Sequence, residues 1–338
     1  MVIGGEFQLN MQIAQMIDKA MDGGKLTAKE LHSLFSVHCL SEEAFIVRQA
    51  ARKMSQAASQ NKAEVHAQVG LDSGPCAKDC QFCAFAAGNK VFSSLVVRTE
   101  EEVLESCLAL ERDGANALYL MGTARYKFGD FIRMGQVVRE ALQPETILIA
   151  NTDDFDDEGA RKLKKVGFDG IYHVVHMGEG RQTGIAPQTR LKTINSAKRA
   201  GLLVGTAVEP IGPEHSVDEL TEKTLMVRNI FPVHAGAGRR VRIPSSPLTA
   251  GELNSAQTSY LLAVVKLAVG YEVRGHCGGH GLGGMAGVNL TWTEVGSNPR
   301  DTERNTLKGA TVKLRREELQ ESGWEILEGP SVMFGRRN

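Results

Sequence analysis

The sequence predicts an α/β protein whose main domain is a (β/α)8 TIM-type barrel, either complete or with fewer strands. From about residue 64, short apolar or β-rich runs alternate with amphipathic stretches of helical length. Alternation of this kind is typical of parallel strands joined by right-handed helical crossovers. Glycine is abundant, at 36 of 338 residues, and much of it follows the apolar runs, where a barrel needs tight turns and close approach to ligands.

Eight runs qualify as strands, which favours a full barrel over a six-stranded open one, although a single sequence places strand ends only loosely. The expected strands cover residues 65–69, 117–121, 147–150, 170–175, 203–208, 240–243, 271–274 and 288–292. The expected helices between them cover residues 99–113, 129–142, 156–166, 188–200, 216–229 and 250–269.

Two further segments flank the barrel, which is expected at residues 61–301. Residues 1–60 are predicted to form an N-terminal helical extension, in which Thr27 and Glu30 have the spacing of a capping box. Its expected role is to pack over one end of the main domain. Residues 302–338 carry mixed charge and are expected to form a C-terminal cap or tail.

Composition and charge indicate which partners and which cellular compartment to expect. A formal net charge of −1 gives no general signal for nucleic acid or for an acidic membrane surface. No apolar run reaches the roughly 20 residues needed to span a bilayer. Residues 1–6 lack the basic region and apolar stretch of a secretory signal. We therefore expect a cytoplasmic protein without nucleic-acid or membrane partners.

Three of the six cysteines lie directly after the first expected strand. Cys76, Cys80 and Cys83 have the spacing C-x3-C-x2-C. Soft thiolates suit iron–sulfur clusters and zinc. Three thiolates on one short loop can bind three irons of a [4Fe–4S] cubane and leave the fourth iron without a protein ligand.

A structural zinc ion is the alternative interpretation of these cysteines. It would need a fourth ligand, which Cys277 or a histidine could supply. Structural zinc sites usually pair two short cysteine knuckles, whereas this sequence has one knuckle plus one cysteine. The cluster is therefore favoured. Cys39 and Cys107 lie near or within expected helices and are expected to be structural.

The cysteine spacing, its place after the first strand and the barrel pattern resemble the radical S-adenosylmethionine (SAM) superfamily. Phe82, directly before the last cysteine, also fits the family motif. Over roughly residues 20–300 the chain is similar to the biotin synthase-like branch, which includes biotin synthase, the [FeFe]-hydrogenase maturase that resembles it and methylornithine synthase. The resemblance implies that Cys76, Cys80 and Cys83 hold a [4Fe–4S] cluster and that SAM binds its open iron.

The resemblance also implies SAM contacts after the second and fourth strands. Met121, Gly122 and Thr123 match the place where the family contacts the SAM amino group, although the same residues could form a simple turn. Arg190 matches an arginine that commonly pairs with the SAM carboxylate. A guanidinium fork suits that role because it can bind both oxygens, whereas without the resemblance Arg190 would be a solvated helix residue.

Further cofactor-binding candidates follow the fourth and fifth strands. His176 lies where related maturases place residues that touch SAM or substrate, and Glu179 is a candidate for contact with the ribose. Glu209 could bind ribose hydroxyls or substrate, and Ile211 belongs to a segment that resembles the family's adenine contact. His173 alternates to the other face of its strand and is expected to be a core residue.

One departure from biotin synthase concerns its second, [2Fe–2S] cluster. The resemblance places the three cysteine ligands of that cluster near Leu120, Ala150 and Gly205, and none of these is cysteine. We therefore expect this chain to lack the second cluster and not to make biotin by the usual route.

The predicted substrate region combines two segments of the second half of the barrel. Arg240 and Arg242 resemble a cavity-lining region of the family. Arg274, His276 and Cys277 are candidate catalytic residues, because they cluster in a glycine-rich loop expected after the seventh strand. Cys277 could donate a proton or hydrogen atom or ligate an extra metal, and the alternative is a buried structural cysteine. Remaining candidates are His280, Glu294 and the turn at 298–301.

The resemblance implies a specific kind of reaction. An external reductant such as ferredoxin or flavodoxin would supply one electron, and SAM would be cleaved to a 5′-deoxyadenosyl radical that takes hydrogen from a small molecule. Without the second cluster, rearrangement or fragmentation in cofactor or metallocofactor biosynthesis is favoured over sulfur insertion or methylation. A non-catalytic iron–sulfur electron-transfer or scaffold protein is the remaining alternative.

Overall fold

The computed structural model describes residues 10–279, 282–296, 298–300 and 311–335. Its barrel strands are β1 (Lys62–Gly70), β4 (Ala117–Met121), β5 (Ile147–Asn151), β6 (Gly170–Tyr172), β7 (Leu203–Gly205), β9 (His234–Arg239), β10 (Gly275–Cys277) and β11 (Leu290–Val295). Within the described residues these eight strands are parallel and form one ring, because β9 pairs with both β7 and β10, and β11 pairs with β1. The predicted (β/α)8 fold class is confirmed.

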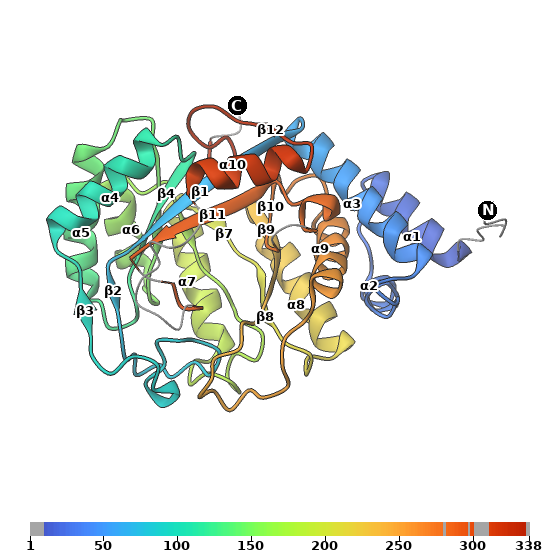
Figure 1. Ribbon diagram of the computed structural model, residues 1–338, viewed down its shortest axis with the longest axis horizontal. Helices are drawn as coiled ribbons and strands as arrows, with labels where there is room; N and C mark the ends of the chain where they lie inside the picture. The colour runs from blue at the N-terminus through green and yellow to red at the C-terminus, as the bar shows by residue number, and fades with distance from the viewer. Residues whose placement is uncertain (1–9, 280–281, 297, 301–310, 336–338) are drawn as a thin grey trace.

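Helices on the outside of the barrel follow the strands (Figure 1). Several begin at a side chain that caps the helix and satisfies its first N–H groups, as Thr99, Ser216 and Asn254 do with complete capping boxes. The helices are α4 (Glu100–Arg112), α5 (Phe128–Ala141), α6 (Asp157–Val166), α7 (Pro187–Arg199), α8 (Val217–Ile230) and α9 (Ser255–Val269).

Alternation along β1 separates the outer core from the barrel interior. Val65 and Val69 point outward into an apolar cluster shared with the helices. His66 points inward, where its ring lies near other interior rings, and Gln68 reaches the cavity. The interior is therefore partly polar, whereas the layer between strands and helices is apolar.

The N-terminal helices α1 (Met11–Met21), α2 (Ala28–Phe35) and α3 (Glu42–Ser59) pack on one side of the barrel against α8 and α9 (Figure 1). Helix α2 begins with the predicted capping box. Glu30 N–H donates to the Thr27 hydroxyl at 3.2 Å, and Thr27 N–H donates to the Glu30 carboxylate at 2.6 Å.

The C-terminal segment closes the amino end of the barrel. Helix α10 (Val312–Glu321) packs on β1 and β11, and β12 (Glu325–Ile326) pairs with the start of β1. Beyond β12, Met333 and Phe334 are buried in one cluster with the interior residues Tyr119 and Cys277. This end of the barrel is therefore filled by side chains, and the open end is the one at the carboxyl ends of the strands.

Two strands begin at different residues from those expected. The sixth strand is β9, not residues 240–243, and the seventh is β10, not residues 271–274. Both are rich in glycine and lack the β-branched residues that signal a strand. Smaller pieces are β2 (Asp72–Ser73), β3 (Val96–Val97), β8 (Val208–Ile211) and the single turns η1 (Ala87–Asn89) and η2 (Gly284–Ala286).

No helix within the described ranges has both the length and the apolar character needed to cross a bilayer.

Candidate active site

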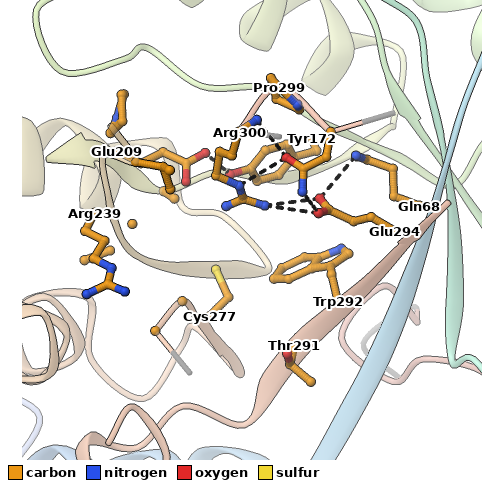
Figure 2. A pocket seen from close by; sticks show the side chains of 18 of the residues that line it. Gln68, Tyr172, Glu209, Arg239, Cys277, Thr291, Trp292, Glu294, Pro299 and Arg300 are labelled. Carbon is orange, nitrogen blue, oxygen red and sulfur yellow. Dashed lines mark hydrogen bonds and ion pairs between the residues drawn. The ribbon is translucent and has the colours of Figure 1, made fainter. Parts of the chain in front are cut away.

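A cavity of about 880 Å³ lies inside the barrel at the carboxyl ends of the strands. Sites for small molecules commonly have volumes of about 300–1,000 Å³. The wall includes Tyr119 and Tyr172 near the centre of the barrel and Trp292 from β11. Figure 2 shows Cys277 and Trp292 on one side of this space and Glu209, Tyr172 and Arg300 on another. The cavity therefore has an aromatic floor and a charged rim.

The loop that carries the three cysteines is held over this cavity by backbone bonds. Within the loop, Cys76 N–H donates to the Phe85 carbonyl at 2.6 Å, and Cys83 N–H donates to the Cys80 carbonyl at 2.9 Å. The loop is also tied to other strand ends, because Ala84 N–H donates to the Pro299 carbonyl at 2.7 Å. The position of the cysteines thus depends on more than one barrel loop.

The cysteines lie on the inner side of this loop. Cys80 and Cys83 line the cavity, and Cys76 is buried beside them at 8% exposure. Burial raises the pKa of both cavity cysteines to about 12, and the charge of Glu179 adds to the effect on Cys80. Any metal that binds these thiols must therefore displace their protons.

The three thiols are chemically compatible with a cubane cluster. Among the described residues, no group of three or more His, Cys, Asp or Glu side chains is placed to hold one metal ion. A cubane makes a different demand, because each thiolate binds its own iron and the three sulfurs need not converge on one point. Cys76, Cys80 and Cys83 are therefore suited to hold the three irons that a [4Fe–4S] cluster presents to a protein.

His176, Glu179 and Arg190 form one network behind Cys80, in which Glu179 and Arg190 are buried and His176 is half-buried. His176 Nδ1 lies 2.9 Å from Glu179 Oε2, and its ring contacts Phe82 of the cysteine loop with centroids 5.0 Å apart. Arg190 Nε lies 3.6 Å from the same Glu179 oxygen. His176 lines the cavity directly, whereas Glu179 and Arg190 lie behind it, so the predicted residues are brought together but not all at the surface of the site.

Two acidic residues of this network, Asp153 and Asp154, were missed by the sequence analysis. Asp154 Oδ2 lies 3.0 Å from Arg190 Nη1, and Asp154 Oδ1 lies 3.0 Å from His173 Nε2. Burial raises the pKa of Asp154, but the His173 hydrogen bond and the Arg190 charge outweigh it and hold the pKa at about 2. Arg190 is thus already paired with carboxylates. The sequence signal was the acidic pair Asp153–Asp154 just after β5, where barrels place functional residues.

The Met121–Thr123 segment is divided between two environments. Met121 lines the cavity. The Thr123 hydroxyl donates to Asp72 at 2.6 Å and its N–H donates to the same carboxylate at 2.7 Å, so Thr123 holds β2 in place. Of these three candidates, within the described chain, only Met121 is part of the cavity wall.

The segment after β7 supplies one acidic group to the cavity. Glu209 lines it and accepts a short hydrogen bond from the Tyr172 hydroxyl. Ile211 is buried in the cluster that packs against α8 and α9. Arg240 is buried against Glu214, and Arg242 is exposed. Because β9 begins earlier than expected, the residues of this segment that reach the cavity are Arg239 and Val241 instead.

The rim near β11 carries a polar cluster (Figure 2). Arg300 Nη2 donates to Glu294 at 3.1 Å, and Gln68 Nε2 donates to the same carboxylate at 3.4 Å. Asn298 makes a short hydrogen bond to Glu294 as well. The sequence named Glu294 and this turn as pocket residues; Asp301 and His280, named with them, lie outside the described residues.

The shifted start of β10 changes the environment expected for three candidates. Cys277 lies on the strand with its side chain in the cavity. His276 points outward and is fully buried, with Nδ1 3.2 Å from the Ala235 carbonyl. Arg274 precedes β10, at the closed end of the barrel, and reaches the Val332 carbonyl at 3.4 Å. The structure therefore brings Cys277 to the site but leaves Arg274 and His276 away from it.

The positions matched to the second biotin synthase cluster have distinct surroundings. Leu120 and Ala150 are buried in the outer cluster between strands and helices, so they face away from the cavity. Gly205 faces inward, where an added Cβ would lie 2.0 Å from His234 Nε2. The expected lack of that cluster stays a prediction.

Comparison with known proteins adds independent information. Residues 73–225 match the family model described as the radical SAM superfamily. A biotin synthase from Magnetococcus marinus is 26% identical over 173 residues, covering 49% of this chain and 54% of that protein. A 7,8-didemethyl-8-hydroxy-5-deazariboflavin synthase from Methanobrevibacter smithii is 24% identical and covers 46% and 52%. The chain thus matches only about half the length of these relatives.

Solved structures show the same fold over nearly the whole chain. A crystal structure of methylornithine synthase superposes with a TM-score of 0.77 at 18% identity and covers 94% of this chain and 98% of that one. The FeFe-hydrogenase maturase HydG from Carboxydothermus hydrogenoformans gives the same TM-score at 18% identity and covers 96% and 81%. Residues 73–225 are therefore similar to the radical SAM superfamily, and in sequence and fold the chain is similar to members of its biotin synthase-like branch.

Proposed function

We propose that this protein is a radical SAM enzyme in which Cys76, Cys80 and Cys83 hold a [4Fe–4S] cluster. The observation that carries the proposal is the placement of Cys80 and Cys83 in the wall of the same cavity as the interior polar residues. Side chains close the other end of the barrel, so a reactive species in this cavity would be shielded from water on that side.

The chain's own residues would bind and orient the reactants. When bound, the cluster would supply the electron that cleaves SAM to a 5′-deoxyadenosyl radical. Glu209, fixed by the Tyr172 hydroxyl, presents a carboxylate that can accept from ribose or substrate hydroxyl groups. His176, held against Phe82 and Glu179, would support the cysteine loop.

The substrate is proposed to be a small molecule that is rearranged or fragmented in cofactor or metallocofactor biosynthesis. The names of the similar proteins support this class, since they include a biotin synthase, a deazariboflavin synthase and a hydrogenase maturase. A one-electron donor such as ferredoxin or flavodoxin would complete the system.

Anaerobic reconstitution with iron and sulfide, followed by dithionite and SAM, tests the proposal. Wild-type protein should bind about four irons per chain and release 5′-deoxyadenosine. Cys39→Ala serves as the matched control, because Cys39 is a free cysteine of the N-terminal region. A brown, cluster-loaded protein that yields no 5′-deoxyadenosine would instead support an electron-transfer or scaffold role. About six irons per chain would indicate a second cluster of the biotin synthase kind.

A further inference from the structure

Five buried side chains connect the closed end of the barrel to the cavity. Glu64 and His66 come from β1, Tyr119 from β4, His234 from β9 and Cys277 from β10. Each is at most 4% exposed, and Tyr119 and Cys277 are also part of the cavity wall. The proposed cluster and SAM roles use none of these side chains.

We call these five side chains the axial chain. Neighbouring members of the axial chain lie within hydrogen-bonding distance of each other. Glu64 Oε2 lies 2.8 Å from His66 Nε2, and His66 Nδ1 lies 3.0 Å from the Tyr119 hydroxyl. That hydroxyl lies 3.3 Å from His234 Nε2, and His234 Nδ1 lies 3.7 Å from the Cys277 sulfur. Glu64 Oε1 accepts from two backbone N–H groups of the C-terminal segment, which seals the far end.

The carboxylate of Glu64 sets the direction of every bond when both imidazoles are neutral. A carboxylate only accepts, so His66 donates through Nε2 and accepts the Tyr119 O–H at Nδ1. Tyr119 then accepts from His234 Nε2–H, and His234 Nδ1 is left as an acceptor. The remaining donor is the Cys277 S–H, which points at His234.

Two glycines leave room for the His234 ring that this chain requires. A Cβ on Gly205 would lie 2.0 Å from His234 Nε2, and a Cβ on Gly275 would lie 2.5 Å from His234 Cβ. Both distances are far shorter than any allowed contact, so a larger residue at either position would displace the ring. The chain of contacts thus depends on residues from five strands.

The surroundings favour a neutral thiol over a thiolate. Burial raises the pKa of Cys277, and the charge of Glu209 adds to this effect. Burial also lowers the pKa of His234 well below its usual value. A thiolate nucleophile paired with an imidazolium is therefore disfavoured. No group of three metal-binding side chains that could include Cys277 occurs in the described part of the chain, which argues against an extra metal there.

We infer that Cys277 is a hydrogen-atom donor to carbon radicals formed in the cavity. This inference rests on the proposed radical SAM function. An S–H bond is weaker than the C–H bond that forms, so transfer is downhill: the radical carbon gains a C–H bond, and Cys277 becomes a thiyl radical. A low-potential one-electron donor then reduces the thiyl to a thiolate. The thiolate takes a proton from solvent at the open end of the cavity, and the S–H again donates to His234 Nδ1.

In this assignment Cys277 is a catalytic residue and the other four are positioning residues. His234 orients the S–H bond, and Tyr119 fixes the His234 tautomer. Glu64 and His66 set the direction of the bonds.

Cleavage of SAM alone, without substrate, tests the inference in D2O. The probe is the reconstituted full chain with dithionite and SAM, with added thiols left out. Because the Cys277 proton exchanges with solvent, wild-type protein should release 5′-deoxyadenosine that carries one deuterium at the 5′ carbon. Cys277→Ser keeps a donor for His234 but has an O–H bond too strong to give up its hydrogen atom, so its product should lose the label.

The control variant distinguishes a failure of the Cys277 inference from a failure of the proposed function. Thr291→Val removes a hydroxyl of the cavity wall that lies outside the axial chain, and its product should stay labelled. Equal labelling from wild type and Cys277→Ser, or loss of the label only in Thr291→Val, would overturn the inference and leave the proposed function standing. Cluster-loaded protein that forms no 5′-deoxyadenosine would overturn the proposed function and the inference with it.

A second readout needs neither cluster nor SAM. The S–H stretching band of Cys277 is obtained as the infrared difference between wild type and Cys277→Ala. It should lie at the lower frequency of a hydrogen-bonded thiol and move to higher frequency in His234→Phe, which keeps a ring but has no acceptor. A band at the same frequency in both proteins would contradict the positioning role of His234, even if the variant is as stable as wild type.

Discussion

The barrel holds two buried polar networks that differ in charge. The network behind the cysteine loop is ionic: Arg190 is surrounded by Asp153, Asp154 and Glu179 at N–O distances of 3.0–3.6 Å. The axial chain from Glu64 to Cys277 has one carboxylate and no lysine or arginine among its five members. Fixed opposite charges hold a structure in place, whereas a chain of imidazole, phenol and thiol can change which atom carries each proton. We therefore expect the first network to act on stability and the second on chemistry.

The largest predicted effect is the loss of the cluster in Cys80→Ala. Cys80 lies against the ionic network, since Glu179 and Arg190 both act on its pKa. Removal of one of three thiolates should abolish iron retention and SAM cleavage together while the axial chain remains intact. Iron content, visible absorbance and the infrared thiol band measure these separately. Retention of the full iron content would show that Cys80 is not a ligand.

The next effect should come from Arg190→Met, which leaves Asp154 and Glu179 buried without their cation. Breaking a buried ion pair in this way costs about 3–5 kcal/mol. Urea unfolding of the cluster-free protein measures the change in the free energy of unfolding. Arg199→Met is the matched control, because Arg199 pairs with Asp157 at 60% and 49% side-chain exposure. Such an exposed pair contributes less than about 1 kcal/mol, and equal costs for the two variants would contradict the distinction.

Protein stability at the axial chain should depend on the space around the His234 ring and not on charge. Gly205→Ala would push a methyl group against His234 and should destabilise the protein by up to about 3 kcal/mol. Combining Gly205→Ala with His234→Ala removes the ring that obstructs the new methyl group. The double variant should therefore be more stable than the sum of the two single changes predicts. Additive costs from a double-mutant cycle would mean that Gly205 and His234 do not compete for the same space.

The sequence indicated the first half of the barrel better than the second. Strands β1, β4 and β5 are apolar and partly β-branched, so their ends were predicted to within a few residues. In β9 the sequence His-Ala-Gly-Ala-Gly-Arg has little intrinsic preference for a strand, and only its neighbours define it. The sequence analysis therefore placed Arg240 in the cavity wall, where the structure has Arg239, and it placed Arg274 at the wrong end of the barrel.

The site residues show the same division between local and distant information. The cysteine loop was recognisable because its spacing is local. The partnership of Glu64 with His66 is also local, but their link to His234 crosses the barrel between positions 53 and 115 residues apart in sequence. No pattern along one chain reports such contacts, because they depend on which inward positions of different strands share a level of the barrel.

The smallest of these effects is the acid sensitivity that Asp154 contributes. Its pKa is about 2 in the folded protein, against an ordinary value of 3.8. A carboxyl whose folded pKa is lowered contributes stability that is complete above its unfolded pKa and is lost as the pH falls through the folded value. The contribution should therefore be constant above about pH 5 and decrease by about 2 kcal/mol as the pH falls towards 2.

Asp154→Asn isolates this contribution from that of every other carboxyl group. Its free energy of unfolding should lie below that of the wild type at neutral pH, and the gap between the two proteins should narrow as the pH falls from about 5. A variant of the axial chain, Tyr119→Phe, serves as the comparison for Asp154→Asn. Tyr119→Phe removes a hydroxyl whose pKa burial raises well above its ordinary value. Its difference from wild type should not change over that acid range, and a gap that narrows equally for both variants would show that the two networks titrate as one.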